Sequence, residues 1–522
     1  MLDLLLPARP EFGQPRVRSV NGVRFIPNSF PPHDFASVDR QLVDTPQSGV
    51  PLLLASVEDG RSSAENLPCA IVCDERESRG VALFLEWSGL WRIAINKRSL
   101  ASENDARGRC LHLAAGLRGL RLQLRRGQVL PLPRVLLTAF DGNLETGGNS
   151  LRRHIRRHVT PRLGGQEALP PTSFNHWFAF ANAFTADMLK PAVEASAAAG
   201  LEYFCVDGGW FAGDFRAGIG NWDEGDPKKF PQGIRPFADF VRAAGLKYGT
   251  WFEPEWAHGD IALHRAHPEW FRPTPAVSPY QTPANAPFLD PDYHLMDFGL
   301  RDVRRWWVNR IRRAYDEWGV RWIRWDFNQM PRPNWERGEP DGDVGWGQIG
   351  HVTGLYEALD EVLGACPELL LEQCASGGNR IDLGTVRRGH SFWMNDHTTH
   401  TDLVRALQHG LNTVLPGTYP NTNICQARHD FTDYDYLSHG AGGFGCSGRL
   451  GEAPKGEFDR NRASVARFKR YRPLLLGDYH RTTGQPQRAE DYVQVVFSDG
   501  SGSVKLEFNP PGAPRQARCI MA

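Results

Sequence analysis

Strand-like and helical segments alternate about eight times between residues 172 and 440, and this alternation constrains the fold more than any other feature of the sequence. In the clearest helical segment, Val303, Trp307, Ile311 and Trp318 recur at the spacing of one buried helix face. A strand-like segment follows directly at 320–328, and others lie at 201–210, 246–254, 369–373, 391–395 and 411–415. The pattern predicts an α/β fold with a central (β/α)8 TIM barrel, whose active site lies at the carboxyl ends of its strands.

The two ends of the chain have a different pattern. Short apolar runs broken by turn residues occur at 17–25, 70–72, 80–85, 91–95, 117–124 and 134–139, which is typical of an antiparallel sandwich. Near the other end, the runs 493–497 and 504–508 flank a glycine-rich turn and predict a hairpin. We therefore expect an N-terminal β-sandwich domain (1–165), the catalytic barrel (166–474) and a small C-terminal antiparallel β domain (475–522).

Composition excludes several classes of function. Sixty basic residues balance sixty acidic ones, so no overall field favours nucleic acid or an anionic membrane as a partner. No segment approaches the roughly 20 apolar residues of a spanning helix. The nine cysteines lack metal-ligand spacing, and the first residues do not read as a secretory signal, so a cytoplasmic location is expected. The arginine-rich run 152–157 is interpreted as a solvated linker or a domain seam.

The segment 320–328 carries the first candidate catalytic group. Because side chains alternate along a strand, Arg324, Asp326 and Asn328 share one face, and the apolar residues between them form the other. The apolar face suits packing against outer helices, so the cation, the carboxylate and the amide are expected to point into the barrel. A buried Arg324–Asp326 ion pair is the alternative explanation.

A second candidate carboxylate, Asp396, ends the segment 391–396, where alternation groups it with Phe392 and Met394. Retaining glycosidases need two carboxyl groups about 5–5.5 Å apart, one to attack the anomeric carbon and one to act as acid and then base. Asp326 and Asp396, at the ends of different strands, would fit this demand. Five other carboxylates at or near strand ends compete for these roles: Asp207, Glu253, Glu255, Asp297 and Glu372.

Five short motifs occur in order along the barrel region. They are FCVDGGWF at 204–211, WFEPE at 251–255, RWDFN at 324–328, EQCASGGNR at 372–380 and WMND at 393–396. In these motifs the sequence resembles glycoside hydrolase family 36, the melibiase-type α-galactosidases. The resemblance implies Asp326 as the nucleophile and Asp396 as the general acid/base of a retaining reaction, without a metal or an organic cofactor.

The resemblance also implies residues that bind the substrate. Asp207 matches a residue that binds sugar hydroxyls, and Arg324 stands where the family usually has a lysine. Arg380, together with Asp382, is expected to brace the loop that begins at Cys374. The other residues expected to bind substrate are Trp210, Trp222, Trp251, Asn328, Cys374 and Gly377.

The sequence departs from the family pattern at positions that bear on the choice of sugar. Gly208 replaces a second aspartate, Arg324 replaces the lysine, and the segment after Asn395 differs, with His397 and His400 nearby. The leading expectation is a retaining exo-α-glycosidase that hydrolyses terminal α-galactosyl-type residues of a small oligosaccharide or glycoside. The alternatives are a modified or different α-sugar (an α-N-acetylgalactosaminide or a sugar altered at C6), a transglycosylase like raffinose synthase, and a non-enzymatic sugar-binding protein. Family members often assemble, which leaves homo-oligomer formation open.

Overall fold

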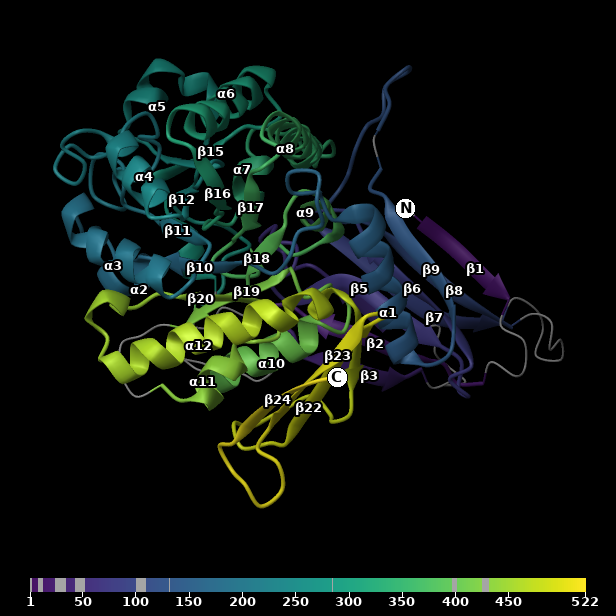
Figure 1. Cartoon of the computed structure of the whole chain (residues 1–522). Coiled ribbons are helices and arrows are strands. Elements are labelled where there is room, and N and C mark those ends of the chain that lie inside the picture. The colour runs from purple at the N-terminus through teal and green to yellow at the C-terminus, as the bar shows by residue number, and fades with distance from the viewer. Residues whose placement is uncertain are drawn as a thin grey trace.

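The computed structural model describes residues 2–7, 13–23, 34–42, 52–99, 109–130, 132–283, 285–396, 401–424 and 431–522. A closed barrel of eight parallel strands occupies the left part of Figure 1 and confirms the predicted TIM barrel. Neighbouring barrel strands follow the order of the chain. They are β10 (Thr172–Asn175), β11 (Tyr203–Val206), β12 (Lys247–Phe252), β16 (Val320–Trp325), β17 (Leu370–Gln373), β18 (Ser391–Trp393), β19 (Pro420–Ile424) and β20 (Gly443–Cys446).

Helices cover the outside of the barrel (Figure 1). The longer ones are α3 (Ala186–Ala198), α4 (Ile234–Ala243), α6 (Arg301–Glu317), α8 (Trp346–Ala365), α10 (Thr401–Leu411) and α12 (Lys455–Tyr471). The short ones are α2 (Trp177–Phe180), α5 (Ala262–Ala266), α7 (Arg332–Trp335), α9 (Leu383–Arg387) and α11 (Asp433–Ser438). None of the helices in the described ranges is both long and apolar enough to cross a membrane.

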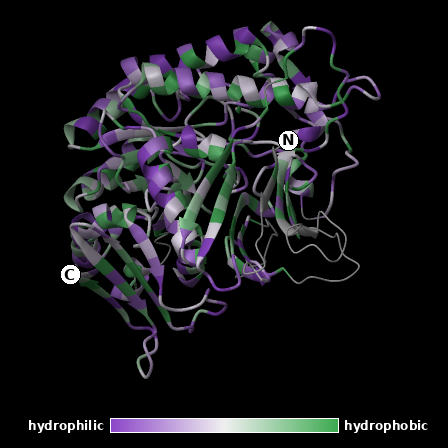
Figure 2. Ribbon diagram, turned by 90° about the vertical axis from the view of Figure 1, so that its right-hand side faces the viewer, coloured by the Kyte–Doolittle hydropathy of each residue, from purple (hydrophilic) through white to green (hydrophobic). Residues whose placement is uncertain are grey.

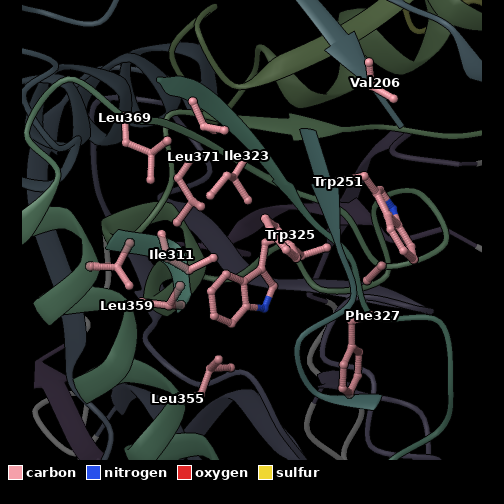
Figure 3. Close-up of a cluster of buried hydrophobic side chains, with 14 of the residues drawn as sticks. Val206, Trp251, Ile311, Ile323, Trp325, Phe327, Leu355, Leu359, Leu369 and Leu371 are labelled. Carbon is pink, nitrogen blue, oxygen red and sulfur yellow. The ribbon is translucent and has the colours of Figure 1, made fainter. Parts of the chain in front are cut away.

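The core between the strands and the outer helices is built from the apolar face that the sequence pattern predicts. Figure 2 shows that the outer helices carry both hydrophilic and hydrophobic residues. In the close-up of Figure 3, Ile323 and Trp325 of β16 lie beside Ile311 of α6 and Leu355 and Leu359 of α8. All five side chains are almost completely buried. Alternation along β16 therefore leaves its other face for polar groups inside the barrel.

Two antiparallel sheets formed by the N-terminal part of the chain lie beside the barrel, at the right of Figure 1. The five-stranded sheet has the order β3 (Ser37–Gln41), β2 (Arg16–Asn21), β5 (Asn66–Cys73), β6 (Arg79–Leu85) and β9 (Val135–Asp141). The four-stranded sheet has the order β1 (Leu2–Pro7), β8 (Arg109–Leu117), β7 (Trp91–Ser99) and β4 (Leu52–Ala55). These sheets confirm the antiparallel β architecture expected before the barrel.

One N-terminal strand prediction is wrong. A strand was expected at 117–124. The strand in this part of the chain is β8, which comes earlier and ends at Leu117. The alternating buried residues of β8 are Leu111, Leu113 and Ala115, and the following segment forms only an isolated bridge between Arg121 and Val344. The leucines after residue 117 therefore pack irregularly instead of pairing along a neighbour.

The last part of the chain forms a separate four-stranded antiparallel sheet, at the bottom of Figure 1. Its strands are β21 (Asp478–Arg481), β22 (Val493–Asp499), β23 (Gly502–Phe508) and β24 (Ala517–Met521). The predicted hairpin is confirmed, with Phe497 paired to Val504. A further three-stranded sheet, made of β13 (Trp256–His258), β15 (Tyr293–Met296) and β14 (Phe271–Pro273), comes between β12 and β16 in the chain.

The prediction of a barrel strand at 411–415 is also wrong. Helix α10 ends at Leu411, a turn follows, and the strand in this position of the barrel is β19, five residues beyond the expected segment. The sequence of β19 carries Asn421, Thr422 and Asn423, which are fully buried. Asn421 donates to Glu372 and Asn423 donates to Ser447, so partners from distant segments satisfy the polar groups of this strand. An apolar pattern could not reveal such a strand.

Arg152 joins three parts of the molecule and accounts for the start of the arginine-rich run. It lies in α1 (Leu144–His154), and its side chain is buried. The guanidinium donates to the carbonyl oxygens of Asn412 and Leu415 after α10, and to those of Leu475 and Gly477 just before β21. Of the two interpretations of the run, a domain seam fits this arginine, because its donors tie the barrel to the C-terminal sheet.

Candidate active site

Arg324 of β16 crosses the inside of the barrel between two carboxylates. Its Nε donates to Glu372 on β17 at 2.8 Å, and its Nη1 donates to Asp207, just after β11, at 2.9 Å. All three side chains are almost fully buried. Within the described part of the chain, Arg324 forms ion pairs with Asp207 and Glu372. The structure therefore does not show the alternative Arg324–Asp326 pair. The two ion pairs fix these buried acids in place.

Asp207 is held by several partners and still has room for a further donor. Beyond Arg324, its carboxylate accepts hydrogen bonds from the side-chain amide of Asn175 at 2.5 Å and from the backbone N–H of Gly208 at 2.8 Å. Its own backbone N–H donates to Nδ1 of His176 at 2.8 Å. Burial lowers the pKa of His176 to about 4, which leaves that ring neutral and able to accept this bond. The ends of β10 and β11 together therefore hold Asp207 rigidly.

Asp326 follows β16 and is held by donors from three directions. The indole N–H of Trp251 donates to one carboxylate oxygen at 3.0 Å. The backbone N–H groups of Phe327 and Ser376 donate to the other oxygen, at 2.8 and 3.4 Å. Asp326 is 8% exposed, so little of it is open to solvent. A carboxylate fixed in this way is well placed to attack in a single direction.

Asp396 lies three residues beyond Trp393, the last residue of β18, whose indole N–H donates to its carboxylate at 2.7 Å. The residue as a whole is exposed, but the protein groups packed around its carboxyl group exclude much of the water. This desolvation and the negative charge of Asp326 raise the pKa of Asp396 to about 6. Asp396 therefore carries a proton in mildly acidic solution, as a general acid requires.

Consecutive barrel strands bring the two aspartates together. Strands β16, β17 and β18 pair side by side, and Asp326, Cys374 and Asp396 follow their respective ends. Burial and the charges of both aspartates act together on the thiol of Cys374 and raise its pKa well above the usual range. The expected grouping of Asp396 with Phe392 and Met394 is wrong, because those two pack into an apolar cluster while Trp393 contacts Asp396. Strand β18 ends at Trp393, so alternation does not continue to residue 396.

The loop after β17 fits tightly against the segment that carries Asp396. Gly377 has φ +84°, and a Cβ atom at this position would lie 3.0 Å from Cα of Asn395 and 3.1 Å from the carbonyl oxygen of Met394. Only glycine fits both the left-handed backbone and this contact. In the same loop, the Ser376 hydroxyl donates to the side-chain oxygen of Asn328 at 2.7 Å. The loop therefore links the ends of β16 and β18.

Glu255 is a structural carboxylate that anchors Arg380. It accepts from Arg380 at 2.8 Å, from His351 at 2.9 Å and from the indole of Trp325 at 3.1 Å. Burial opposes its ionisation, but these partners outweigh burial and lower its pKa. The guanidinium of Arg380 also lies 4.0 Å from the ring centre of Phe327. Arg380 thus braces the segment next to Asp326, whereas its expected role with Asp382 in bracing the loop that begins at Cys374 stays a prediction.

Glu253, two residues earlier, has a different environment. It is buried, and one oxygen accepts the backbone N–H of Asn328 at 2.7 Å. No described cation forms an ion pair with it. Burial and the neighbouring charge of Asp326 raise its pKa well above the usual range. Glu253 is therefore a neutral neighbour of Asp326 around pH 7.

The three tryptophans expected to bind sugar occupy different positions. Trp251 contacts Asp326 directly. Trp210 and Trp222 are fully buried in an aromatic cluster behind it, where Trp210 donates to the carbonyl oxygen of Trp251 at 2.8 Å. The rings of Trp222 and Trp251 lie 5.8 Å apart. Contact of Trp210 and Trp222 with a sugar stays a prediction, whereas their support of Trp251 is direct.

Sequence reasoning missed several side chains that shape this site. They are Asn175, His176, Trp177, Phe215, Ser376 and Asn421. Asn175 and Asn421 bind the carboxylates of Asp207 and Glu372, and Ser376 binds Asp326 and Asn328. Asn175, His176, Trp177 and Ser376 lie at or just after strand ends, which could have singled them out, whereas Phe215 and Asn421 carry no such signal. His397 and His400 lie outside the described residues, and among the described ones no cluster of His, Cys, Asp or Glu could hold a metal ion.

Comparison with known families identifies the chain. The melibiase family model matches residues 132–430, more than half of the 522 residues. The chain therefore belongs to the melibiase family, glycoside hydrolase family 36, as the five motifs indicated.

Curated relatives and solved structures agree with this assignment. Alpha-galactosidase 1 of Pediococcus pentosaceus is 28% identical over 389 residues, which are 71% of this chain and 51% of that protein. Alpha-galactosidase Mel36A of Lactobacillus acidophilus is 27% identical over 326 residues, which are 62% of this chain and 43% of that protein. The chain thus spans about half the length of these relatives. The GH36 alpha-galactosidase AgaA from Geobacillus stearothermophilus has the same fold, with a TM-score of 0.81, 19% identity and coverage of 98% of this chain and 69% of that one.

Proposed function

We propose that this chain is a retaining exo-α-glycosidase that hydrolyses terminal α-galactosyl-type residues of a small oligosaccharide or glycoside. The observation that carries the proposal is the pair of carboxyl groups after β16 and β18, of which Asp326 is fixed by three donors and Asp396 has a raised pKa. Two carboxyls with different environments are what double displacement needs.

In the first step, a carboxylate oxygen of Asp326 attacks the anomeric carbon while Asp396 gives its proton to the departing glycosidic oxygen. The aglycone leaves as an alcohol, and the sugar is bound to Asp326 through an ester-like bond. In the second step, Asp396 takes a proton from water as the water oxygen attacks the anomeric carbon. The bond to Asp326 breaks, and a sugar with the original anomeric configuration is released.

The surrounding residues position the sugar in this proposal. Asp207 and Arg324 face the site from β11 and β16 and can bind hydroxyl groups. Asn328, Cys374 and Gly377 border the loop between the two aspartates. Trp251 fixes Asp326, with Trp210 and Trp222 behind it, and Arg380 holds the same segment through Glu255.

Relatives support the substrate class. The two curated relatives described above are named alpha-galactosidases. Doubly substituted forms of AgaA have been crystallised in complex with stachyose and with raffinose. An oligosaccharide with a terminal α-galactosyl residue is therefore the first substrate to test.

A direct test is hydrolysis of p-nitrophenyl α-glycosides of galactose, N-acetylgalactosamine, glucose and 6-modified sugars. We expect release of nitrophenol from a galactose-configured glycoside and loss of this activity in Asp326→Ala. The anomer first released, observed by NMR, should be the α-anomer. Release of the β-anomer would contradict the retaining reaction, and binding without turnover of any of these glycosides would favour a sugar-binding protein.

Three further expectations belong to this proposal. The division into domains at 1–165, 166–474 and 475–522 is testable by limited proteolysis. A cytoplasmic location is supported by seven cysteines of the described part of the chain that are free thiols. Formation of homo-oligomers is testable by light scattering during size-exclusion chromatography.

A further inference from the structure

Phe215 occupies the space in which a side chain at position 208 would lie. A Cβ atom built on Gly208 would be 2.4 Å from the edge of the Phe215 ring. Gly208 directly follows Asp207, so this space adjoins the carboxylate that Arg324 and Asn175 hold. An apolar ring therefore lies where the backbone next to Asp207 would otherwise present a side chain.

The ring of Phe215 also lies beside the tryptophan that binds the nucleophile of the proposed reaction. Its centre is 5.8 Å from that of Trp251, whose indole N–H binds Asp326. On its other side, it lies 4.7 Å from the ring of Trp177. Phe211, Trp222 and Trp251 of the same aromatic group are fully buried, whereas Phe215 is only half-buried. Phe215 is thus a partly exposed member of the aromatic group that includes Trp251, the residue that binds Asp326.

The stereochemistry of the sugar decides what Phe215 would meet. A nucleophile attacks an α-glycoside from the ring face opposite to the leaving group. In the D-galacto series that face carries the hydroxymethyl group at C5 and the axial hydroxyl at C4. In a sugar that places its C4 hydroxyl on Asp207, the hydroxymethyl group at the neighbouring C5 would point toward the space beside Gly208 that Phe215 occupies.

A hydroxyl placed against a phenyl ring loses its water without gaining a partner, which is unfavourable. A methyl group or a hydrogen atom at the same place gains apolar contact. Resting on the proposed function, we propose that Phe215 selects a terminal sugar of galactose configuration that lacks the C6 hydroxyl, namely a 6-deoxygalactoside or the corresponding pentopyranoside.

The test compares kcat/KM for three nitrophenyl glycosides with one ring stereochemistry: α-D-galactopyranoside, α-D-fucopyranoside and β-L-arabinopyranoside. We expect the wild type to prefer at least one of the two substrates without the C6 hydroxyl by about 10-fold or more over the galactoside. In Phe215→Ala, water can enter beside the hydroxymethyl group, and the preference should fall to within about 3-fold. Phe215→Leu keeps an apolar surface and should keep the preference. Circular dichroism and thermal unfolding check that both variants are folded.

The outcomes separate this inference from the proposed function. Turnover of any of the three glycosides that Asp326→Ala abolishes supports the glycosidase. If the galactoside is then the best substrate, or if Phe215→Ala leaves the ratio unchanged, the role of Phe215 is refuted while the glycosidase stands. Absence of turnover on all three glycosides refutes both.

Discussion

The indole N–H of Trp393 donates a hydrogen bond to the carboxylate of Asp396, with 2.7 Å between the two atoms. Burial and the charge of Asp326 raise the pKa of Asp396, whereas this bond favours the ionised form and lowers it. The resulting pKa of about 6 is a balance between opposing influences. Removing the indole donor should raise the pKa of Asp396, and removing the charge of Asp326 should lower it.

The guanidinium of Arg324 lies 4.3 Å from the ring centre of Trp393. Replacing Trp393 with phenylalanine removes the indole donor and keeps an aromatic ring at this place. The pKa of Asp396 should then rise. Because the first step needs Asp396 protonated, activity is present below this pKa and lost above it. The alkaline limb of the kcat/KM profile should therefore lie near pH 6 in the wild type and at higher pH in Trp393→Phe. A limb that stays in place or moves to lower pH would contradict this role of the indole.

Glu253 should reduce stability as the pH rises. Folding raises its pKa, so the folded state keeps the proton while the unfolded state loses it above about pH 4.5. Stability from this group is complete at low pH and declines as pH increases. Glu253→Gln removes the decline and keeps an acceptor for the N–H of Asn328. We measure the free energy of unfolding in urea. The value of the variant relative to that of the wild type should increase between pH 5 and 7 by on the order of 1 kcal/mol.

Glu255→Gln is the matched control on the other side of Pro254. Here the pKa is lowered by Arg380, His351 and Trp325 in spite of burial, so removing the charge leaves Arg380 without its ion pair. This change should destabilise the protein by about 3–5 kcal/mol near pH 7. Equal effects of the two substitutions would show that the environments are not distinct.

The sequence was sufficient for the architecture wherever burial has a simple period. Helix α6 and strand β16 show the two periods, and both were predicted because one face of each is apolar. Strand β19 was missed because its buried residues are polar, and their partners Glu372 and Ser447 are far away in the sequence. A strand of this kind is defined by tertiary contacts and not by its own pattern.

In the candidate site, too, some features follow from local sequence patterns and others depend on tertiary contacts. The motifs placed Asp326, Asp396 and Asp207 at strand ends, and the structure places them there. The pairing of Arg324 with Glu372, the bond from Asn175 to Asp207 and the packing of Phe215 against Gly208 depend on segments 30 or more residues apart or on loop geometry. No local spacing contains that information.

Gly377→Ala should lower activity more than stability. Alanine has to adopt a left-handed backbone, at a cost of about 1–2 kcal/mol, and its methyl group presses on the backbone that carries Asp396. We expect kcat to fall by at least about 10-fold, because small displacements of catalytic groups are costly. Gly364→Ala is the control, since a Cβ atom there meets nothing within 4 Å in helix α8. Equal activity in the two variants would contradict the proposed role of the Gly377 contact.

Arg324→Lys tests the double ion pair inside the barrel. A single ammonium group cannot reproduce the two directed bonds to Asp207 and Glu372, so one buried carboxylate loses a partner. We expect a loss of about 1–3 kcal/mol in the free energy of unfolding and a higher KM. Arg321→Lys on the same strand is the control, because its partner Glu368 is exposed and the pair should contribute less than about 1 kcal/mol. Similar losses in both variants would refute the special role of Arg324.

The roles of Asp326 and Asp396 are tested most directly by chemical rescue with azide. Asp326→Ala should lower turnover of a nitrophenyl galactose-configured glycoside at least about 10³-fold, and azide should restore it while forming the β-glycosyl azide. In Asp396→Ala the glycosyl-enzyme still forms from this reactive substrate, and azide should yield the α-glycosyl azide. Proton NMR of the two products distinguishes the anomers. The reverse assignment of products, or full activity in either variant, would contradict the account.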